Sequence, residues 1–470
     1  MVATFTARRS SPELVTPARP TPRETKLLSD LDDQWTLRYY ETVVGFFRVC
    51  PKMAGGLPGG DNIAAKVIKA AVAEALVYYY PVAGRLRADL VPGANNKLAV
   101  DCTAEGVAFV EATADVRLEE LGEPLLPPYP CVEEFLGDAG DTRHILDKPL
   151  LFLQVTQLKC SGFVIGLHMC HCIFDAFGLL QFIKTIAGFA GGEPIPSTMP
   201  VWGRESFFAA RTPPSFTHVY PAYKPILDGS SAGDGDGDDD VMLATPPETM
   251  VMKYFSFGPK EISALRSLIP AHLTRSTTAF ELLTAVMWRC RTSALGYEPD
   301  RRVRLMFTLN LRGRWWNREE AAVPPGYYGN AHLSPMVMAT VGELARQPLA
   351  DTVELMCRAK ADTTRERVES MVDLLATWRE RPASAFAMDR TYEVSDTKWV
   401  GGGGGALRCG VAEMVGGGTP FAGDLASKLI SYHMKCKNEN GEDSIVVSML
   451  LPEPAMERFM KEMSFWLKSY

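Results

Sequence analysis

The segment from His168 to Gly178 holds the densest group of reactive side chains in the 470-residue chain. It contains two histidines, two cysteines and an aspartate, namely His168, Cys170, His171, Cys172 and Asp175. These residue types are all zinc ligands. An imidazole also titrates near neutral pH, so a histidine can remove a proton from an alcohol as the alcohol attacks a carbonyl carbon. The segment is therefore compatible with a metal site and with a general base.

The local structure expected around this segment disfavours the metal site. Apolar and alternating residues over 149–165 predict a β-hairpin whose second strand runs into the histidines, and a helix is predicted from Ala176. On a strand, residues 168, 170 and 172 face one side and His171 the other. Since the sequence has no second Cys/His cluster, we predict no metal. His171, with Asp175 four residues later, is then a general base, or both histidines are simply buried and hydrogen-bonded.

Composition and charge exclude several classes of protein. The chain is 46% hydrophobic, and its 49 basic against 56 acidic residues give a net charge of −7. We therefore expect no nucleic-acid or membrane partner, because no general cationic surface exists and no apolar run reaches the roughly 18 residues of a membrane span. The first twenty residues lack a signal-peptide core, and ten dispersed cysteines without a CxxC pair indicate free thiols. A cytoplasmic protein is expected.

The length favours two or three domains with a mixed α/β fold. Breaker residues crowd the region 191–248, which includes the acidic run Asp228–Asp240. Such a composition is typical of a linker or an exposed loop, not of a calcium site, so we predict domains at 1–190 and 249–470 joined by a crossover at 191–248. Further elements are expected as an extended arm at 1–25, helices after Asp61 and at 260–268, 277–292 and 349–379, and strands at 250–257, 303–309, 427–435 and 444–450.

The Asp-Ala-Phe-Gly continuation at 175–178 resembles the HxxxDG centre of the plant BAHD acyltransferases, which use coenzyme A thioesters. Other landmarks of that family follow in its order, at 80–86, 276–281 with Trp288-Arg289, 310–312, 326–330 and 392–396. The resemblance covers nearly the whole chain. Residues 8–24, 149–160 and 289–292 are most similar to the branch of benzyl alcohol O-benzoyltransferases and alcohol acyltransferases.

This resemblance implies two chloramphenicol-acetyltransferase-like domains of mixed sheet plus helices, with the active-site channel between them. Acyl-CoA is then a co-substrate that enters from one face, and a small alcohol enters from the other. His171 is the general base of a transfer without a covalent acyl-enzyme, and Ser395 aligns with the family's donor to the oxyanion. Asp175 forms a structural ion pair with Arg312. Coenzyme A contacts fall on Ser276, Thr277, Gly416 and Gly418.

The chain departs from the family at its second signature, Asp-Phe-Gly-Trp-Gly. That motif falls on Met414-Val415-Gly416-Gly417-Gly418, where Asp, Phe and Trp are missing. Successive glycines have many backbone states to lose on ordering, so a flexible loop with weaker coenzyme A binding is expected. The overall prediction is a monomeric O-acyltransferase without a permanent cofactor that moves a benzoyl-type group to an alcohol such as benzyl alcohol. Hydroxycinnamoyl or acetyl transfer to a monolignol, terpenoid or amine, and a non-catalytic binding protein, stay open as alternatives.

Overall fold

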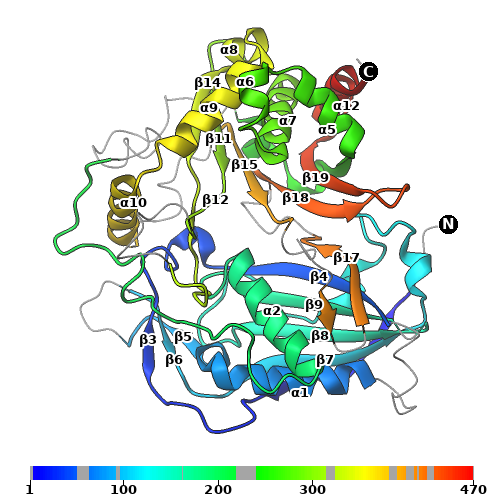
Figure 1. Cartoon of the computed structure of the whole chain (residues 1–470), viewed down its shortest axis with the longest axis vertical. Helices are drawn as coiled ribbons and strands as arrows, with labels where there is room; N and C mark the ends of the chain where they lie inside the picture. The colour runs from blue at the N-terminus through cyan, green and yellow to red at the C-terminus, as the bar shows by residue number, and fades with distance from the viewer. Residues whose placement is uncertain are drawn as a thin grey trace.

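Two large β-sheets with helices packed on them organise the molecule (Figure 1). The computed structural model describes residues 4–49, 63–90, 96–160, 162–218, 240–313, 323–379, 389–398, 407–409, 412–420 and 428–468. The Asp61 cap, the acidic run before Asp240 and the glycine run at 401–405 lie outside these residues. The α/β class predicted from the sequence is confirmed.

The first sheet takes most of its strands from the N-terminal half of the chain. Its order is β1 (Ala7–Arg9), β7 (Val107–Ala114), β8 (Leu151–Leu158), β9 (Phe163–Cys170), β4 (Tyr40–Val49), β17 (Ala412–Gly418) and β16 (Arg408–Cys409), and β2 (Glu13–Val15) also pairs with β7. Two helices, α1 (Ile63–Tyr78) and α2 (Ala176–Ala190), pack against each other beside this sheet. The N-terminal arm is thus extended, and it pairs with the sheet edge.

The second sheet lies in the C-terminal half of the chain, in the order β10 (Met250–Phe257), β19 (Asp443–Pro452), β18 (Ile430–Lys437), β15 (Thr391–Asp396), β11 (Arg302–Phe307) and β14 (Met336–Thr340). Its helices are α5 (Pro259–Ser267), α7 (Ala279–Leu295), α8 (Val341–Arg346), α9 (Leu349–Ala361) and α12 (Glu453–Lys468). Helix α7 is buried along almost its whole length and lies between α9 and α12.

Smaller elements complete the described part of the chain. One small sheet joins β3 (Thr25–Leu27), β6 (Ala99–Asp101) and β5 (Arg85–Arg87), and another joins β12 (Leu309–Asn310) and β13 (His332–Leu333). The other helices are α4 (Val241–Ala244), α6 (Ala271–Thr274), α10 (Arg365–Trp378) and 3₁₀ turns at Trp35–Leu37, Tyr80–Ala83, Leu118–Leu121, Val132–Phe135 and Pro247–Thr249. No described helix has the length and hydropathy of a membrane span.

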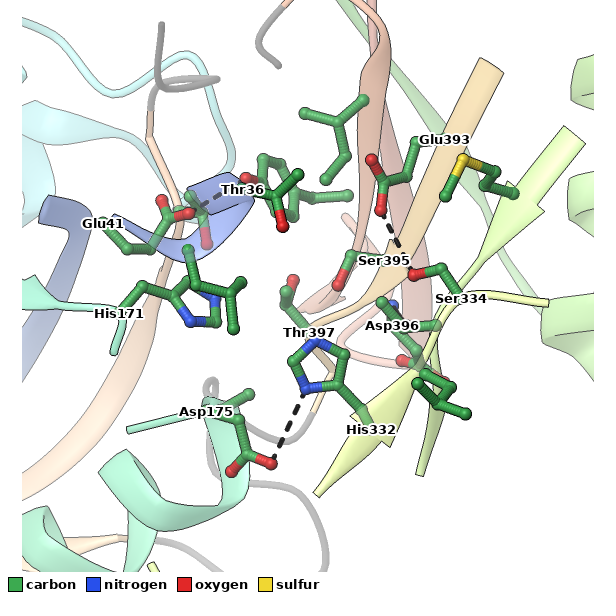
Figure 2. A pocket seen from close by; sticks show the side chains of 18 of the residues that line it. Thr36, Glu41, His171, Asp175, His332, Ser334, Glu393, Ser395, Asp396 and Thr397 are labelled. Carbon is green, nitrogen blue, oxygen red and sulfur yellow. Dashed lines mark hydrogen bonds and ion pairs between the residues drawn. The ribbon is translucent and has the colours of Figure 1, made fainter. Parts of the chain in front are cut away.

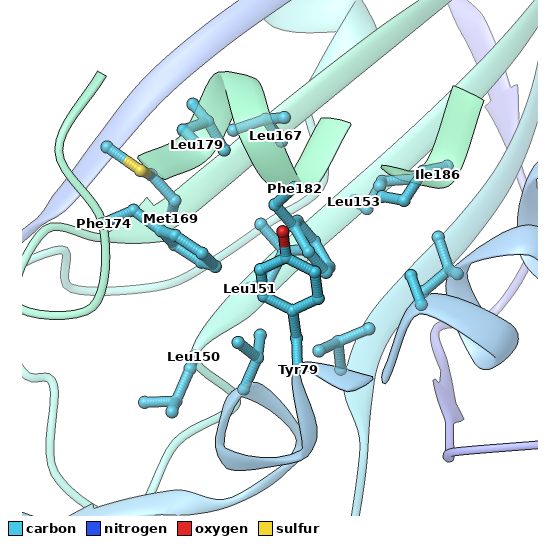
Figure 3. Packing of buried hydrophobic residues seen from close by; sticks show 14 of the residues in the cluster. Tyr79, Leu150, Leu151, Leu153, Leu167, Met169, Phe174, Leu179, Phe182 and Ile186 are labelled. Carbon is cyan, nitrogen blue, oxygen red and sulfur yellow. The ribbon is translucent and has the colours of Figure 1, made fainter. Parts of the chain in front are cut away.

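The predicted hairpin and the helix after it hold the largest core cluster. Strands β8 and β9 are antiparallel, and Leu151, Leu153 and Leu167 face the apolar stripe of α2 (Figure 3). Phe182 of that stripe packs edge-on against Tyr79 at the end of α1, with ring centroids 4.9 Å apart. The position just before α2 is therefore anchored in a rigid core.

Two local expectations are wrong. The single helix predicted for 349–379 is two helices, because the chain turns at Asp362–Thr364 and the Thr364 side chain caps α10. The loop expected at 414–418 is strand β17, which pairs with β4 through a bulge between Met414 and Gly416. Strands β16 and β17 thus extend the first sheet from beyond residue 249. The boundaries 1–190, 191–248 and 249–470 stay a prediction.

Candidate active site

His171 lies one residue beyond β9, in the turn that leads into α2. Its backbone is held on both sides: the amide donates to the Tyr39 carbonyl at 2.9 Å, and the carbonyl accepts from the Asn330 side-chain amide at 2.8 Å. The side chain is half-buried and lines a cavity of about 360 Å³ between the two large sheets. A reactive group just beyond a strand end therefore faces a cavity large enough for a small substrate.

Opposite walls of this cavity come from the two halves of the chain. Figure 2 shows His171 and Glu41 on one side, facing Ser395 and Glu393 of β15 on the other. His332 of β13 projects between them, with its ring centroid 6.1 Å from that of His171. Apolar side chains complete the lining, among them Leu37, Val43, Met169, Phe177, Phe280 and Leu429.

The electrostatics of the cavity keep His171 uncharged. Burial, and then the neighbouring His332, lower the pKa of His171 to about 4. Its Nδ1 atom is buried and has no hydrogen-bond partner among the described residues. An imidazole in this state is neutral at pH 7, so it has a free lone pair with which to accept a proton.

Asp175 turns away from His171 and pairs with Arg312. Its Oδ2 accepts from Arg312 Nη1 at 2.6 Å and its Oδ1 from Arg312 Nη2 at 3.0 Å, a bidentate pair. Oδ1 also accepts from the Gly178 amide at 2.9 Å, which caps α2. Burial opposes ionisation of Asp175, but Arg312 and His332 outweigh it and hold the pKa of the carboxyl well below its usual range.

Three residues that were given no role in the sequence analysis hold the turn after His171, namely Asp32, Arg204 and Asn330. Arg204 donates to the carbonyls of residues 172 and 173 at 3.0 and 2.6 Å, and pairs with Asp32 at 2.9 Å with both side chains fully buried. Asp32 accepts in turn from the Asn330 side chain at 2.8 Å. Only Asn330 has a sequence signal, since it ends the landmark at 326–330; Asp32 and Arg204 lie in no motif.

His168 and the cysteines stay away from the cavity. The His168 ring is fixed between the Thr42 hydroxyl, 2.9 Å from Nδ1, and the Gly137 carbonyl, 3.0 Å from Nε2. Cys170 and Cys172 are buried free thiols. In the described part of the chain, no three His, Cys, Asp or Glu side chains are grouped as a metal site would need.

Of the other residues predicted for the site, some line the cavity and others do not. Ser395 lines the cavity. Ser276 is exposed and Thr277 buried, just before Phe280, which lines the cavity. Gly416 and Gly418 belong to β17 and do not line it, although the next residue, Thr419, does. The structure thus places His171 and Ser395 on the cavity, while their catalytic roles and the coenzyme A contacts remain predictions.

Sequence reasoning also missed a pair of carboxyls, Glu41 and Glu393, that face the cavity from opposite walls. Both carboxyls line the cavity, and burial raises the pKa of Glu41 to about 7 and raises that of Glu393. Glu41 Oε2 accepts from the hydroxyls of Tyr39 at 2.9 Å and Tyr432 at 3.1 Å, and Ser334 donates to Glu393 at 3.4 Å. Glu393 lies within the landmark at 392–396 but was given no role there, whereas Glu41 lies in no motif and Tyr432 reaches it from the other half of the chain.

Comparison with known proteins decides the family. Residues 6–466 match the Transferase family. The chain belongs to this family, the BAHD acyltransferases. It is 59% identical to "Acyl transferase 1" of Oryza sativa subsp. japonica, with 99% of this chain and 97% of that protein covered. It is 47% identical to rice "Spermidine hydroxycinnamoyltransferase 1" (93% and 94% covered) and 43% identical to "Benzyl alcohol O-benzoyltransferase" of Petunia hybrida (99% and 94%).

The solved structures agree on the fold. TRI101 of F. sporotrichioides, a complex with coenzyme A and T-2, superposes with a TM-score of 0.70 at 17% identity, covering 95% of this chain and 98% of that one. The family and the two-domain fold inferred from the HxxxDG-type centre are therefore confirmed, and the chain is an acyltransferase of the BAHD family.

Proposed function

We propose that this acyltransferase moves a benzoyl-type acyl group from coenzyme A to the hydroxyl of a small alcohol such as benzyl alcohol. The observation that carries the proposal is a neutral histidine, His171, held by its backbone at the wall of a cavity of about 360 Å³. The benzyl alcohol O-benzoyltransferase among the relatives supports the choice of acyl group and acceptor.

In the proposed reaction, His171 accepts the hydroxyl proton while the alcohol oxygen attacks the thioester carbonyl carbon. The carbon–sulfur bond then breaks, and the imidazolium returns the proton to the departing thiolate. No bond forms between acyl group and protein. A positioned general base contributes about 10²–10⁴-fold to such a step.

Ser395 is the proposed donor to the oxygen that becomes negative in the tetrahedral intermediate. It lies on β15, across the cavity from His171 (Figure 2). One such donor is worth about 10²–10³-fold in rate. Asp175 and Arg312 act through the turn that carries His171, and Ser276, Thr277, Gly416 and Gly418 are proposed to contact coenzyme A.

An amine acceptor is the second candidate, and two carboxyls that line the cavity favour it. Two buried carboxyls of raised pKa, Glu41 and Glu393, face the cavity, where an ammonium group of a polyamine would stabilise their ionised forms. The spermidine hydroxycinnamoyltransferase among the relatives agrees with this reading.

A donor and acceptor panel tests both candidates. Purified protein is mixed with benzoyl-, acetyl- or hydroxycinnamoyl-CoA and with benzyl alcohol or spermidine, and thiol release is followed together with product mass. We expect the highest kcat/KM with benzoyl-CoA and benzyl alcohol.

The variant Glu41→Gln separates the two candidates, because it removes the negative charge of the Glu41 carboxylate. The rate of acyl transfer to benzyl alcohol should change by less than about threefold, whereas the rate of transfer to spermidine should fall at least tenfold. Turnover of spermidine alone would overturn the alcohol proposal.

A further inference from the structure

The turn that carries His171 is held by side chains from distant parts of the chain, while the imidazole itself projects into the cavity (Figure 2). The His171 carbonyl accepts from the Asn330 side chain at 2.8 Å, across 159 residues of sequence. The next two carbonyls, of Cys172 and Ile173, accept from Arg204 at 3.0 and 2.6 Å. Three successive carbonyls therefore bind two side chains, and these side chains determine how the turn is oriented.

Asp32 joins the two side chains that hold this turn. Its Oδ2 pairs with Arg204 Nη1 at 2.9 Å, and its Oδ1 accepts from the backbone amide and the side-chain amide of Asn330, both at 2.8 Å. All three residues are fully buried. A buried ion pair is costly to desolvate and is by itself weak evidence for stability. Its geometry, however, fixes both side chains that bind the turn.

The guanidinium of Arg204 is confined by its packing as well as by its hydrogen bonds. Its Cζ lies 4.0 Å from the centre of the Trp202 ring and 5.3 Å from that of Tyr328. An added Cβ at Gly329 would be 3.1 Å from the same Cζ, so the backbone also approaches it closely. A planar guanidinium can bind two carbonyls and a carboxylate at once, whereas an ammonium group is a compact point charge. The site therefore requires an arginine.

Arg204 belongs to the predicted crossover, whose composition is typical of a linker. The segment around it is nevertheless tied to both halves of the chain. The Val201 amide donates to the Gly326 carbonyl at 2.8 Å, and the Trp202 indole donates to the Leu27 carbonyl at 3.1 Å. This part of the crossover therefore has a fixed place beneath the turn that carries the histidine.

We propose that Asp32 and Arg204 are positioning residues for the general base, and that the crossover thereby contributes to catalysis. The proposal rests on the proposed function, in which His171 accepts the hydroxyl proton. Neither Asp32 nor Arg204 lines the cavity, so both act through the turn and not on the substrate. A displacement of about 1 Å in a catalytic group can cost about 10²-fold in rate. A small change in how the turn is held should therefore appear in kcat.

Two variants test the proposal, assayed well below their Tm with the donor and acceptor pair of highest kcat/KM. Arg204→Lys keeps the positive charge but loses the planar group that binds both carbonyls. Its kcat should fall at least about tenfold, while the KM of each substrate stays within about threefold. Asn330→Ala removes the donor to the His171 carbonyl without changing a charge, and it should lower kcat in the same way. This second variant keeps the test valid if Arg204→Lys does not fold.

Arg304→Lys is the matched control. Arg304 also pairs with an aspartate, Asp389, at 2.9 Å and donates to a carbonyl at 2.6 Å, but it contacts no part of the turn. The control should lose Tm to a similar extent as Arg204→Lys and keep its kcat within about twofold. An unchanged kcat in Arg204→Lys, or an equal loss of kcat in the control, would overturn the positioning role.

A double-mutant cycle shows whether Arg204 acts through His171. In the His171→Ala background the base is absent, so Arg204→Lys should change the residual kcat by less than about twofold. The same tenfold loss in both backgrounds would mean that Arg204 acts by another route, and it would overturn the inference while leaving the proposed function intact. Near wild-type turnover in His171→Ala alone would instead overturn the proposed base, and the positioning role with it.

Discussion

The state of a single imidazole determines how the proposed reaction depends on pH. The pKa of His171 is lowered to about 4 by burial and then by His332, so its neutral form persists well below the ordinary value of 6.5. The acid limb of kcat/KM should therefore lie near pH 4. His332→Ala removes one of the two causes, so it should move this limb to higher pH. A limb that stays in place, measured from pH 4 to 8 in short assays, would contradict the role of His332.

The two histidines of the motif differ in what they contact, and this gives a matched pair of variants. His171→Ala should lower kcat at least about 10²-fold with little change in Tm, since the side chain lines a cavity. His168→Ala should lower Tm instead, because it removes hydrogen bonds to Thr42 and Gly137. Near wild-type turnover in His171→Ala would refute its assignment as the base.

Asp175 should affect stability as well as rate. Asp175→Asn leaves Arg312 without its charge partner, a change that costs roughly 3–5 kcal/mol for a buried pair. Because the folded-state pKa of Asp175 lies below the ordinary 3.8, its stabilisation is complete above that value and is lost as the pH falls further. The difference in unfolding free energy between wild type and variant should thus shrink below pH 3.8. An Asn variant that melts like the wild type would exclude a structural role.

At the scale of elements, the start of α2 requires a glycine. A Cβ at Gly178 would lie 2.0 Å from the Tyr328 carbonyl oxygen, so the helix would have to move away from the segment that carries Tyr328 and Asn330. Gly178→Ala should lower both Tm and kcat. Gly137→Ala is the control, since an added Cβ there meets only Val110 at 3.7 Å. Equal melting of the two variants would show that this close approach does not matter.

The elements that the sequence predicted correctly are those with a strong local pattern. The hairpin at β8 and β9 and the helix after Asp175 have apolar periodicity and a capping aspartate. Strand β17 has no such pattern, because its glycines have no local strand preference and its pairing with β4 is set by contacts from far along the chain. The break between α9 and α10 at Asp362–Thr364 was missed because the helical periodicity of apolar residues continues on both sides of it, so the local pattern shows no interruption.

At the scale of the molecule, the cavity depends on contacts between the two halves of the chain. Tyr432 of the second sheet donates to Glu41 of the first, and Arg312 and Asn330 reach back to the turn around His171. These partners are more than a hundred residues apart in sequence. Family resemblance predicted His171, Asp175 and Arg312 together, but Glu41 and Tyr432 could not be paired from one sequence, since neither lies in a recognisable motif.

The acidic run within the predicted crossover ends at Asp240. The contacts of this residue determine which deletion the protein should tolerate. The acidic composition up to Asp240 predicts a dispensable loop, but the Asp240 side chain is fully buried: Oδ1 accepts from the Met242 amide and the Tyr297 hydroxyl, both at 2.8 Å, and Oδ2 accepts from the Arg390 amide. The expectation that the acidic run Asp228–Asp240 is an exposed loop is therefore wrong at its last residue.

A deletion of residues 230–239 and the variant Asp240→Ala should thus behave differently. The deletion should leave kcat within about threefold and Tm nearly unchanged, because the cost of a surface connection depends only weakly on its length. Asp240→Ala leaves three buried hydrogen-bond donors without an acceptor, and each unsatisfied donor costs about 1–3 kcal/mol of folding stability. The variant should therefore have a Tm several degrees lower, with an unchanged pH dependence of kcat/KM. Thermal melts and initial rates of the two proteins, measured side by side, decide the matter. If Asp240→Ala melted like the wild type while the deletion unfolded, the anchor of the second half would lie within 230–239 and not at Asp240.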